Sequence, residues 1–291
     1  MSYVHPEYLT EPKALAAEIS AGDESLRIFD ATVYLKPAER GYRAESGRAD
    51  YEQAHIPGAA FLDQMGALSD PRSGLGFTLP DARTLEAALR AAGISNVHRV
   101  VLYSAGHLMW ATRAWWLLHY AGHDRVSVLN GGLDAWKAAG GEVVSGSHDY
   151  PRGSMAVRAR SHRFVGQQDV LDAIGVRGVC TVNALAPDVY SGSSAMSYGR
   201  KGHIAGSINL HYEELLDAGR FRDAAALDAA LGQRGLLSAD RVIAYCGGGI
   251  SATIDAFACL LVGKEEVAVY DGSMSEWVRD TALPMTTGEL P

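Results

Sequence analysis

Cysteine is scarce in this sequence. The three cysteines, Cys180, Cys246 and Cys259, show no pair with the spacing of a metal-binding or redox motif. A disulfide scaffold needs a dense, even set of cysteines, and a structural zinc site needs closely spaced cysteines or histidines. The sequence therefore predicts no disulfide framework, no metal site and no cofactor.

Long apolar runs are also missing. No stretch of the sequence approaches the roughly 20 consecutive apolar residues that a membrane-spanning helix needs. The N-terminal segment carries Glu7, Glu11, Lys13 and Glu18, so it lacks the apolar core of a secretory signal. We therefore expect a cytoplasmic protein without a membrane partner.

Positive charge is in deficit, with 26 Lys and Arg residues against 34 Asp and Glu residues and a net charge of −8 at pH 7. General nucleic-acid binders are usually basic, so we expect no nucleic-acid partner. The remaining composition is that of an ordinary globular protein, with 47% hydrophobic and 21% charged residues. A chain of 291 residues exceeds one comfortable hydrophobic core, which favours two domains.

An internal repeat supports this division. Residues 55–59 read HIPGA and residues 203–207 read HIAGS, while residues 99–104 read RVVLYS and residues 241–246 read RVIAYC. A third matching pair is a glycine-containing turn followed by a tryptophan, at Trp136 and at Trp277. The spacing between the copies changes by only a few residues from pair to pair, so the repeat predicts two homologous domains.

Each copy alternates short apolar segments with helical patterns. The patterns predict strands at residues 26–31, 99–104, 126–129, 179–182, 242–245 and 267–270, and helices at residues 81–92, 109–120, 224–233 and 251–261. Such alternation is typical of the α/β class, in which helices cover both faces of a mostly parallel sheet. The predicted division is an N-terminal domain (1–145), a linker rich in Gly, Ser, Pro and Arg (146–161), and a C-terminal domain (162–291).

The most informative residue is Cys246. It directly follows the predicted strand at 242–245 and precedes Gly247, Gly248 and Gly249, which lead into a predicted helix. Glycines lack Cβ, so successive backbone N–H groups can turn toward one point, and the helix N-terminus adds partial positive charge. We expect a sulfur held there to be a thiolate, which is the nucleophilic form. The alternative is a small, inert core residue at a strand end, and the glycine run favours the reactive interpretation.

Comparison of the two copies separates scaffold from site. His55 and His203 occur in both copies, so we expect each to hold a turn by side-chain hydrogen bonds. At the position of Cys246 the first copy has Ser104, and a serine without a base is not a nucleophile at neutral pH. His107 lies three residues further on, but a histidine on a loop surface is the preferred interpretation. The first domain is therefore predicted to be catalytically silent and to form one wall of a cleft over Cys246.

At these residues the chain resembles the tandem-domain rhodanese-like sulfurtransferases, which act on thiosulfate or 3-mercaptopyruvate. The resemblance rests on the doubled His-Ile-x-Gly, the loop from Cys246 to Ser251, and the Asp-Gly-Ser at 271–273 followed by Trp277. It implies that Cys246 takes a sulfane sulfur from a small donor and passes it, as a persulfide, to cyanide, a thiol or a thioredoxin-like acceptor. It also implies that Ser251 and the loop amides hold the persulfide, the loop residues being Gly247, Gly248, Gly249 and Ile250.

The uncharged loop is similar to that of the mercaptopyruvate branch, but the chain departs from that branch elsewhere. Leu185 and Met196 stand where the branch has two arginines, and Phe77 stands near the position of a first-domain histidine. The candidates that remain for substrate binding each have a plainer interpretation. They are Arg200 and Lys201 (otherwise a solvated surface pair), Arg113 (otherwise a helix residue) and Trp110 (otherwise a core aromatic).

Two rival functions share part of this pattern. A cysteine-based phosphatase needs an arginine six positions after the cysteine, where this chain has Ala252, so a phosphate would lack its charge-assisted partner. The other rival is a non-turnover persulfide carrier or regulatory module that serves one partner protein, and the missing arginines favour it to some extent. Cys180 and Cys259 are expected in the core, so no resolving cysteine for a peroxidase is evident.

Overall fold

The computed structural model describes residues 2–37 and 42–291; Met1 and residues 38–41, which belong to the predicted N-terminal domain, lie outside the described part. It contains two parallel sheets of five strands each. The first has the order β5 (Ala59–Phe61), β2 (Leu26–Asp30), β6 (Arg99–Tyr103), β7 (Val126–Leu129) and β1 (Leu9–Thr10). The second has the order β11 (Ile208–Asn209), β9 (Val179–Asn183), β14 (Arg241–Tyr245), β15 (Val267–Tyr270) and β8 (Phe164–Val165). Matching segments of the repeat take matching places, which confirms the predicted α/β fold with two tandem units.

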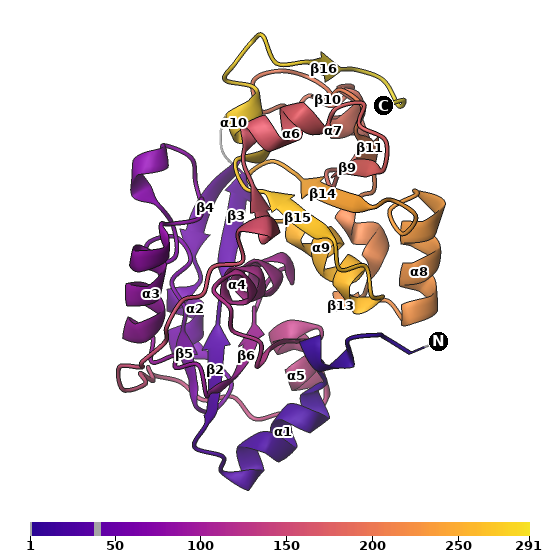
Figure 1. Cartoon of the computed structure of the whole chain (residues 1–291). Helices are drawn as coiled ribbons and strands as arrows, with labels where there is room; N and C mark the ends of the chain where they lie inside the picture. Colours follow the sequence, from indigo (N-terminus) through magenta and orange to yellow (C-terminus); the bar gives the residue numbers. More distant parts are fainter. Residues whose placement is uncertain (1, 38–41) are drawn as a thin grey trace.

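Helices pack on both faces of each sheet (Figure 1). They are α1 (Pro12–Ala21), α2 (Arg48–Gln53), α3 (Ala82–Ala91), α4 (Met109–Tyr120) and α5 (Gly132–Ala138) in the first half, and α6 (Gln167–Ala173), α7 (Pro187–Ser191), α8 (Ala224–Gln233), α9 (Ala252–Leu261) and α10 (Ser273–Trp277) in the second. Alternate residues of a strand face opposite sides of its sheet. In β14, Ile243 therefore packs in the cluster of α6 and α10, whereas Val242 and Ala244 pack in that of α8 and α9.

Two of the predicted helices, α3 and α8, begin at an aspartate that caps them. Asp81 accepts a hydrogen bond from the Thr84 N–H (2.9 Å) at the start of α3, and Asp223 accepts one from the Ala226 N–H (2.9 Å) at the start of α8. Each carboxylate satisfies a backbone donor that has no partner within the helix. The predicted helices at 81–92, 109–120, 224–233 and 251–261 agree with α3, α4, α8 and α9 to within two residues.

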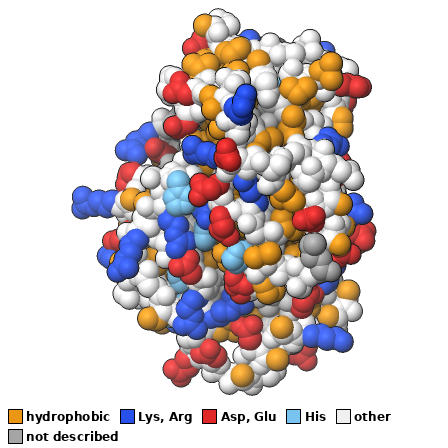
Figure 2. All heavy atoms as spheres, turned by 45° about the vertical axis from the view of Figure 1, so that its right-hand side comes forward, with side chains coloured by type: hydrophobic (Ala, Val, Ile, Leu, Met, Phe, Trp, Pro, Cys, Tyr) orange, Lys and Arg blue, Asp and Glu red, His pale blue; other side chains and the backbone are white. Residues whose placement is uncertain are grey.

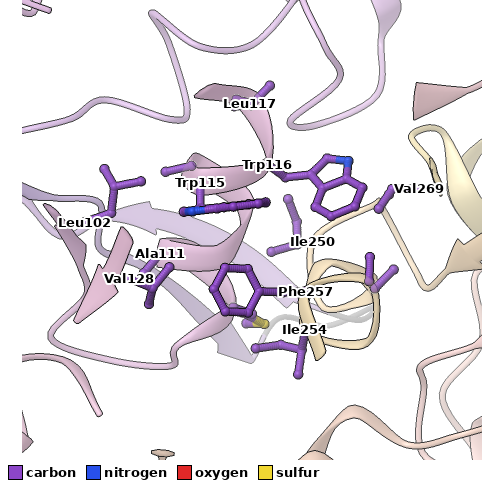
Figure 3. Packing of buried hydrophobic residues seen from close by; sticks show 14 of the residues in the cluster. Leu102, Ala111, Trp115, Trp116, Leu117, Val128, Ile250, Ile254, Phe257 and Val269 are labelled. Atoms are coloured by element: carbon purple, nitrogen blue, oxygen red, sulfur yellow. The ribbon is translucent and has the colours of Figure 1, made fainter. Parts of the chain in front are cut away.

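The two halves share one hydrophobic core, built where α4 meets α9. Figure 3 shows Trp115 of α4 facing Phe257 of α9, and their rings meet edge to face at 4.8 Å. The Thr112 and Thr253 hydroxyls join the same two helices at 2.7 Å. Both helices are buried over nearly all their residues because each packs against its own sheet and against the other helix. The relative placement of the halves is therefore fixed by a packed interface.

The segment predicted as a linker is packed along the first half. Gly153 N–H donates to Arg90 O, Met155 N–H to Ile94 O and Arg158 N–H to Ala121 O. The N-terminal segment of the first half contacts the second half, because Val4 N–H donates to Leu261 O at the end of α9 (Figure 1). The connection between the halves thus follows the surface of the first as an ordered strap.

A β-hairpin that the sequence patterns did not predict is formed by β3 (Val33–Pro37) and β4 (Tyr42–Ser46), which pair antiparallel and rise toward α10 (Figure 1). The remaining short strands are the pairs β10 (His203–Ile204) with β16 (Met285–Thr286) and β12 (Leu216–Asp217) with β13 (Arg220–Phe221). Four 3-10 helices complete the described chain, η1 (Pro6–Tyr8), η2 (Pro71–Ser73), η3 (Ser161–Arg163) and η4 (Tyr212–Leu215).

The surface in Figure 2 intersperses acidic, basic and histidine side chains and shows no large area of one sign. Within residues 2–37 and 42–291, no helix combines the length and the apolar character that crossing a membrane requires.

Candidate active site

Cys246 lies at the carboxyl end of β14, the middle strand of the second sheet. The residue is only 2% exposed. The backbone there is fixed from both sides, since Cys246 N–H donates to Ser273 Oγ (3.1 Å) and Met274 N–H donates to Cys246 O (3.1 Å). The first turn of α10 therefore holds the residue in place at the sheet edge where parallel α/β proteins bind ligands.

The loop after Cys246 turns its carbonyl groups into the protein. Gly247 O accepts hydrogen bonds from Ser275 N–H (2.8 Å) and from Ser275 Oγ (2.7 Å). Gly249 O accepts one from Arg113 Nη1 (3.2 Å), and Ile250 O accepts one from Thr253 N–H (2.9 Å).

The amides of the same loop are left open. Over the described parts of the chain, no N–H group from Gly247 to Ser251 donates to a backbone carbonyl. A trans peptide group points its C=O and N–H in opposite directions. Because the carbonyls of residues 246, 247, 249 and 250 are held by the protein, the N–H groups of residues 247, 248, 250 and 251 point away from those contacts. The loop therefore offers a series of unpaired donors, which suits an anion.

The end of the loop joins the N-terminus of α9 at Ser251, whose hydroxyl makes no capping hydrogen bond with its own helix. The preceding Gly249 has a φ of +73°, and a Cβ there would lie 2.5 Å from the backbone oxygen of Asp271. Glycine is required at this position both for the backbone conformation and for the close approach of the next segment. The last glycine of the run thus has a steric cause.

A cleft of about 760 Å³ opens beside the loop, between the two halves. Its walls come from the β3–β4 hairpin, from the loop around Phe77, from α4, from the segment before β10 and from the Cys246 loop with the start of α10. The lining residues are Leu35, Tyr42, Gly76, Phe77, Trp110, Ala195, Met196, Ser197, Tyr198, Gly199, Gly247, Gly248, Ile250 and Ser275. None of these described lining residues is charged. Phe77, 5.0 Å from the Trp110 ring, has a φ of 64°, which is rare for a bulky side chain and typical of a position that the surroundings enforce.

Arg113 lies beneath this site and is 1% exposed at its side chain. Its guanidinium pairs with Asp271 Oδ1 at 2.7 Å and donates to Gly249 O and to Phe77 O. These contacts join α4 of the first half to the loop of the second. The structure therefore places Arg113 behind the loop and not among the residues that line the cleft.

The other predicted substrate-binding residues are placed as follows. Trp110 lines the cleft from α4. Arg200 donates from Nη1 to Asp280 O (3.1 Å) and to Leu283 O (3.0 Å), so its guanidinium ties the segment before β10 to the C-terminal segment. Lys201 is exposed and is not among the described lining residues. Of the four, only Trp110 is brought to the cleft wall.

Two polar groups near Cys246 were not found from the sequence. Asp255 of α9 is fully buried, and neither carboxylate oxygen has a hydrogen-bond partner in the described chain. Burial, followed by the repulsion that an ionised Cys246 would exert, raises the pKa of this carboxyl well above its usual range. Tyr198 lines the cleft, and burial, again followed by the repulsion that an ionised Cys246 would exert, raises the pKa of its hydroxyl. An acidic residue within the otherwise apolar pattern of α9 was the one signal that sequence reasoning could have used.

The equivalent position in the first half has a different chemistry. Ser104 Oγ donates to the backbone oxygen of His107 (2.8 Å), and the His107 ring contacts Glu213 (3.2 Å) and Met109 N–H (3.0 Å). Both ring nitrogens of His107 are therefore directed to partners other than the serine hydroxyl. His55 and His203 each place Nδ1 on a tyrosine carbonyl, at 2.8 and 2.9 Å, and both are buried, in agreement with the expected structural role.

The fold and the site together define a two-unit α/β protein with one cysteine loop, built on the second unit. In the described residues, no group of three or more His, Cys, Asp and Glu side chains has an arrangement that could hold a metal ion. All three cysteines are free of disulfide bonds.

Comparison with known proteins identifies the class. The model of the Rhodanese-like domain matches residues 11–139 and 186–280. The 3-mercaptopyruvate sulfurtransferase of Escherichia coli K12 is 31% identical over 271 residues, which cover 90% of this chain and 92% of that protein. The thiosulfate sulfurtransferase of Rattus norvegicus is 34% identical over 280 residues, covering 93% of this chain and 92% of its own.

A solved structure agrees with these relatives. The crystal structure of SseA from Escherichia coli, described as a 3-mercaptopyruvate sulfotransferase, superimposes with a TM-score of 0.81 at 30% identity and covers 92% of this chain and 99% of its own. The chain therefore belongs to the family of rhodanese-like domain proteins, and it is an enzyme of the sulfurtransferase type.

Proposed function

We propose that Cys246 carries the sulfur in this reaction. Its thiolate attacks the transferable sulfur of a small donor, which is the outer sulfur of thiosulfate or the thiol sulfur of 3-mercaptopyruvate, and a persulfide forms as the donor's bond to that sulfur breaks. With thiosulfate, sulfite leaves with the electron pair. With 3-mercaptopyruvate, the carbon–sulfur bond breaks, and pyruvate leaves as the enolate, which holds the electron pair and takes up the proton of the donor's thiol. An acceptor nucleophile such as cyanide, a thiol or a thioredoxin-like protein then attacks the outer sulfur, and the electrons of the S–S bond return to Cys246.

The observation that carries this proposal is that the loop's carbonyl groups bond to the rest of the described chain, whereas its N–H groups do not. Carbonyls of residues 246, 247, 249 and 250 bond to the protein, while the amides of residues 247–251 have no backbone acceptor in the described chain. Preorganised N–H donors stabilise negative charge as it develops, and they need no reorganisation during the reaction. The N-terminus of α9 and the uncapped Ser251 hydroxyl lie at the end of the same loop. We infer that these groups hold the persulfide anion.

Both proposed donors are anions, and the described cleft wall contains no cation. Arg113 is engaged with Asp271 and two carbonyls, and Arg200 is engaged with two others. The loop amides are therefore the groups that favour an anionic donor. The uncharged wall also keeps the persulfide carrier as a second candidate function, in which one partner protein discharges Cys246 and small molecules do so slowly.

We further infer that the first half transfers no sulfur. The Ser104 hydroxyl donates a hydrogen bond to the backbone oxygen of His107. The His107 ring contacts Glu213 and Met109 N–H instead of the serine. This half contributes Trp110 and Phe77 to the cleft and Arg113 to the support of the loop.

A donor panel tests the proposal. Thiosulfate and 3-mercaptopyruvate are supplied in turn with cyanide, and thiocyanate formation is followed for the wild type, for Cys246→Ser and for Cys259→Ser. We expect Cys246→Ser to abolish transfer with the fold retained, because the exchange is nearly isosteric. Cys259→Ser is the matched control, a change at a buried cysteine of α9 outside the loop. Retained turnover in Cys246→Ser would contradict the proposal, and a persulfide that only a protein acceptor discharges would support the carrier.

A further inference from the structure

The hydroxyl of Tyr198 occupies the space beside the first residue after the cysteine. A Cβ added to Gly247 would lie 2.0 Å from Tyr198 Oη and 2.2 Å from Tyr198 Cζ. No side chain can share that space with the phenol, so the glycine at 247 admits the tyrosine hydroxyl to the backbone of the loop. This contact places Tyr198 Oη one residue from Cys246.

The hydroxyl is available as a donor. Burial contributes most to the shift in the pKa of Tyr198, followed by the charges that Cys246, Tyr42 and Tyr212 carry when ionised. No hydrogen bond to the Tyr198 hydroxyl is among these causes. All of these raise the pKa, so the hydroxyl keeps its proton at neutral pH. A protonated phenol offers one O–H donor. The Tyr198 hydroxyl lines a cleft whose described lining residues include no cation.

Its position matches the path of the sulfur. Tyr198, Gly247 and Gly248 line the same cleft. The Gly247 and Gly248 N–H groups belong to peptide groups whose carbonyls bond to α10, so these N–H groups point away from α10. Cys246 itself is 2% exposed and is not among the described lining residues, so the cleft reaches the loop at the two glycines that follow it. A hydroxyl in contact with Gly247 therefore lies on the side from which this cleft reaches the loop.

We propose that Tyr198 is a catalytic residue that donates a hydrogen bond to the transferring sulfur; this rests on the proposed persulfide function of Cys246. When the Cys246 thiolate attacks, the S–S bond to Cys246 forms, the donor's bond breaks and its electron pair leaves with the donor remnant. The outer sulfur then bears the negative charge, and the Tyr198 hydroxyl stabilises it beside the loop amides. When the acceptor attacks, the S–S electrons return to Cys246. Tyr198 keeps its proton throughout.

The test compares Tyr198→Phe with the wild type in the two half-reactions separately. The variant removes one oxygen and retains the ring that packs on Gly247. We expect Cys246 still to gain one sulfur by intact mass, while kcat/KM falls about 10- to 100-fold, the loss expected for one hydrogen bond to a charged group. The fall should reside in kcat, and the near-ultraviolet band of the loaded persulfide should shift. Tyr3→Phe is the control, since it removes a tyrosine hydroxyl that bonds Arg222 O outside the cleft.

A second variant guards against a purely structural effect. Gly247→Ala should push the phenol away from the loop, so its loss and that of Tyr198→Phe should not add in the double variant. Rates of Tyr198→Phe within twofold of the wild type, or a rise in KM with kcat unchanged, would overturn the catalytic role. If the wild type itself gains no sulfur on Cys246, the proposed function fails and the role of Tyr198 fails with it. If the wild type loads and Tyr198→Phe matches it, only the role of Tyr198 fails.

Discussion

Replacement of Arg113 by methionine tests how the two halves build one site. The guanidinium is 1% exposed, and the Asp271 side chain that it pairs with at 2.7 Å is 16% exposed. Removing one partner of a buried ion pair costs about 3–5 kcal/mol because the other charge stays buried without compensation. Asp271 retains some solvent and its hydrogen bond from Leu79 N–H, so we expect the lower end, about 3 kcal/mol.

The same substitution should also weaken catalysis. Arg113 holds Gly249 O, and the peptide group of that carbonyl contains the Ile250 N–H. Without the arginine this donor is free to turn away from the loop's centre. A misplaced donor of an anion-binding loop costs about 10-fold or more in rate. The folded variant should therefore be slower even at temperatures where it is fully native.

Urea unfolding and steady-state kinetics measure the two effects on one sample. The expected result is a lower free energy of unfolding for Arg113→Met with an unchanged m-value, and partial recovery in Arg113→Met/Asp271→Asn, because the second change removes the unpaired charge. Arg279→Met serves as the control, since this exposed arginine donates to Gly74 O. A loss of less than about 1 kcal/mol in Arg113→Met, or a double variant no more stable than the single one, would show that the buried pair does not support the fold in this way.

Three further predictions concern separate parts of the chain. Ser104→Ala should leave sulfur transfer within about twofold, because the serine hydroxyl is used by a backbone oxygen; a large loss in turnover would show that the first half is not silent. Gly249→Ala should destabilise by clearly more than Gly22→Ala in thermal unfolding, since both have positive φ and share a penalty of about 1–2 kcal/mol, but only residue 249 meets a backbone atom. His123 is buried with a pKa lowered by burial to about 4, so acidification from pH 7 to 5 protonates the unfolded state first and removes about 2 kcal/mol of stability. His123→Phe should lose correspondingly less over that range, and equal losses in pH-dependent urea unfolding would count against this assignment.

The framework of the fold was accessible from the sequence because it depends on local patterns. The strand before Cys246, the helix after it and the cap at Asp81 each depend on residues that are close in the sequence. The internal repeat indicates that the same pattern occurs twice. The reactive loop was accessible for the same reason, since its glycines are consecutive.

The parts that the sequence did not reveal depend on contacts between distant segments. The β3–β4 hairpin exposes much of both strands, so it shows no alternation of buried and polar residues. Tyr198 is placed by its contact with Gly247, and nothing in its own neighbourhood marks it. Arg113 was a candidate for substrate binding, and only the tertiary structure brings Asp271 to it. Pairings of this kind have no signature in one sequence.

The proposed reaction requires that Cys246 accept and hold a single sulfur atom. The most direct measurement is intact mass after incubation with thiosulfate or 3-mercaptopyruvate, followed by peptide mapping of the loaded chain. We expect one added sulfur, located on the peptide that contains Cys246 and removed by cyanide. An unchanged mass with both donors, or an added sulfur on Cys180 or Cys259 instead, would contradict it.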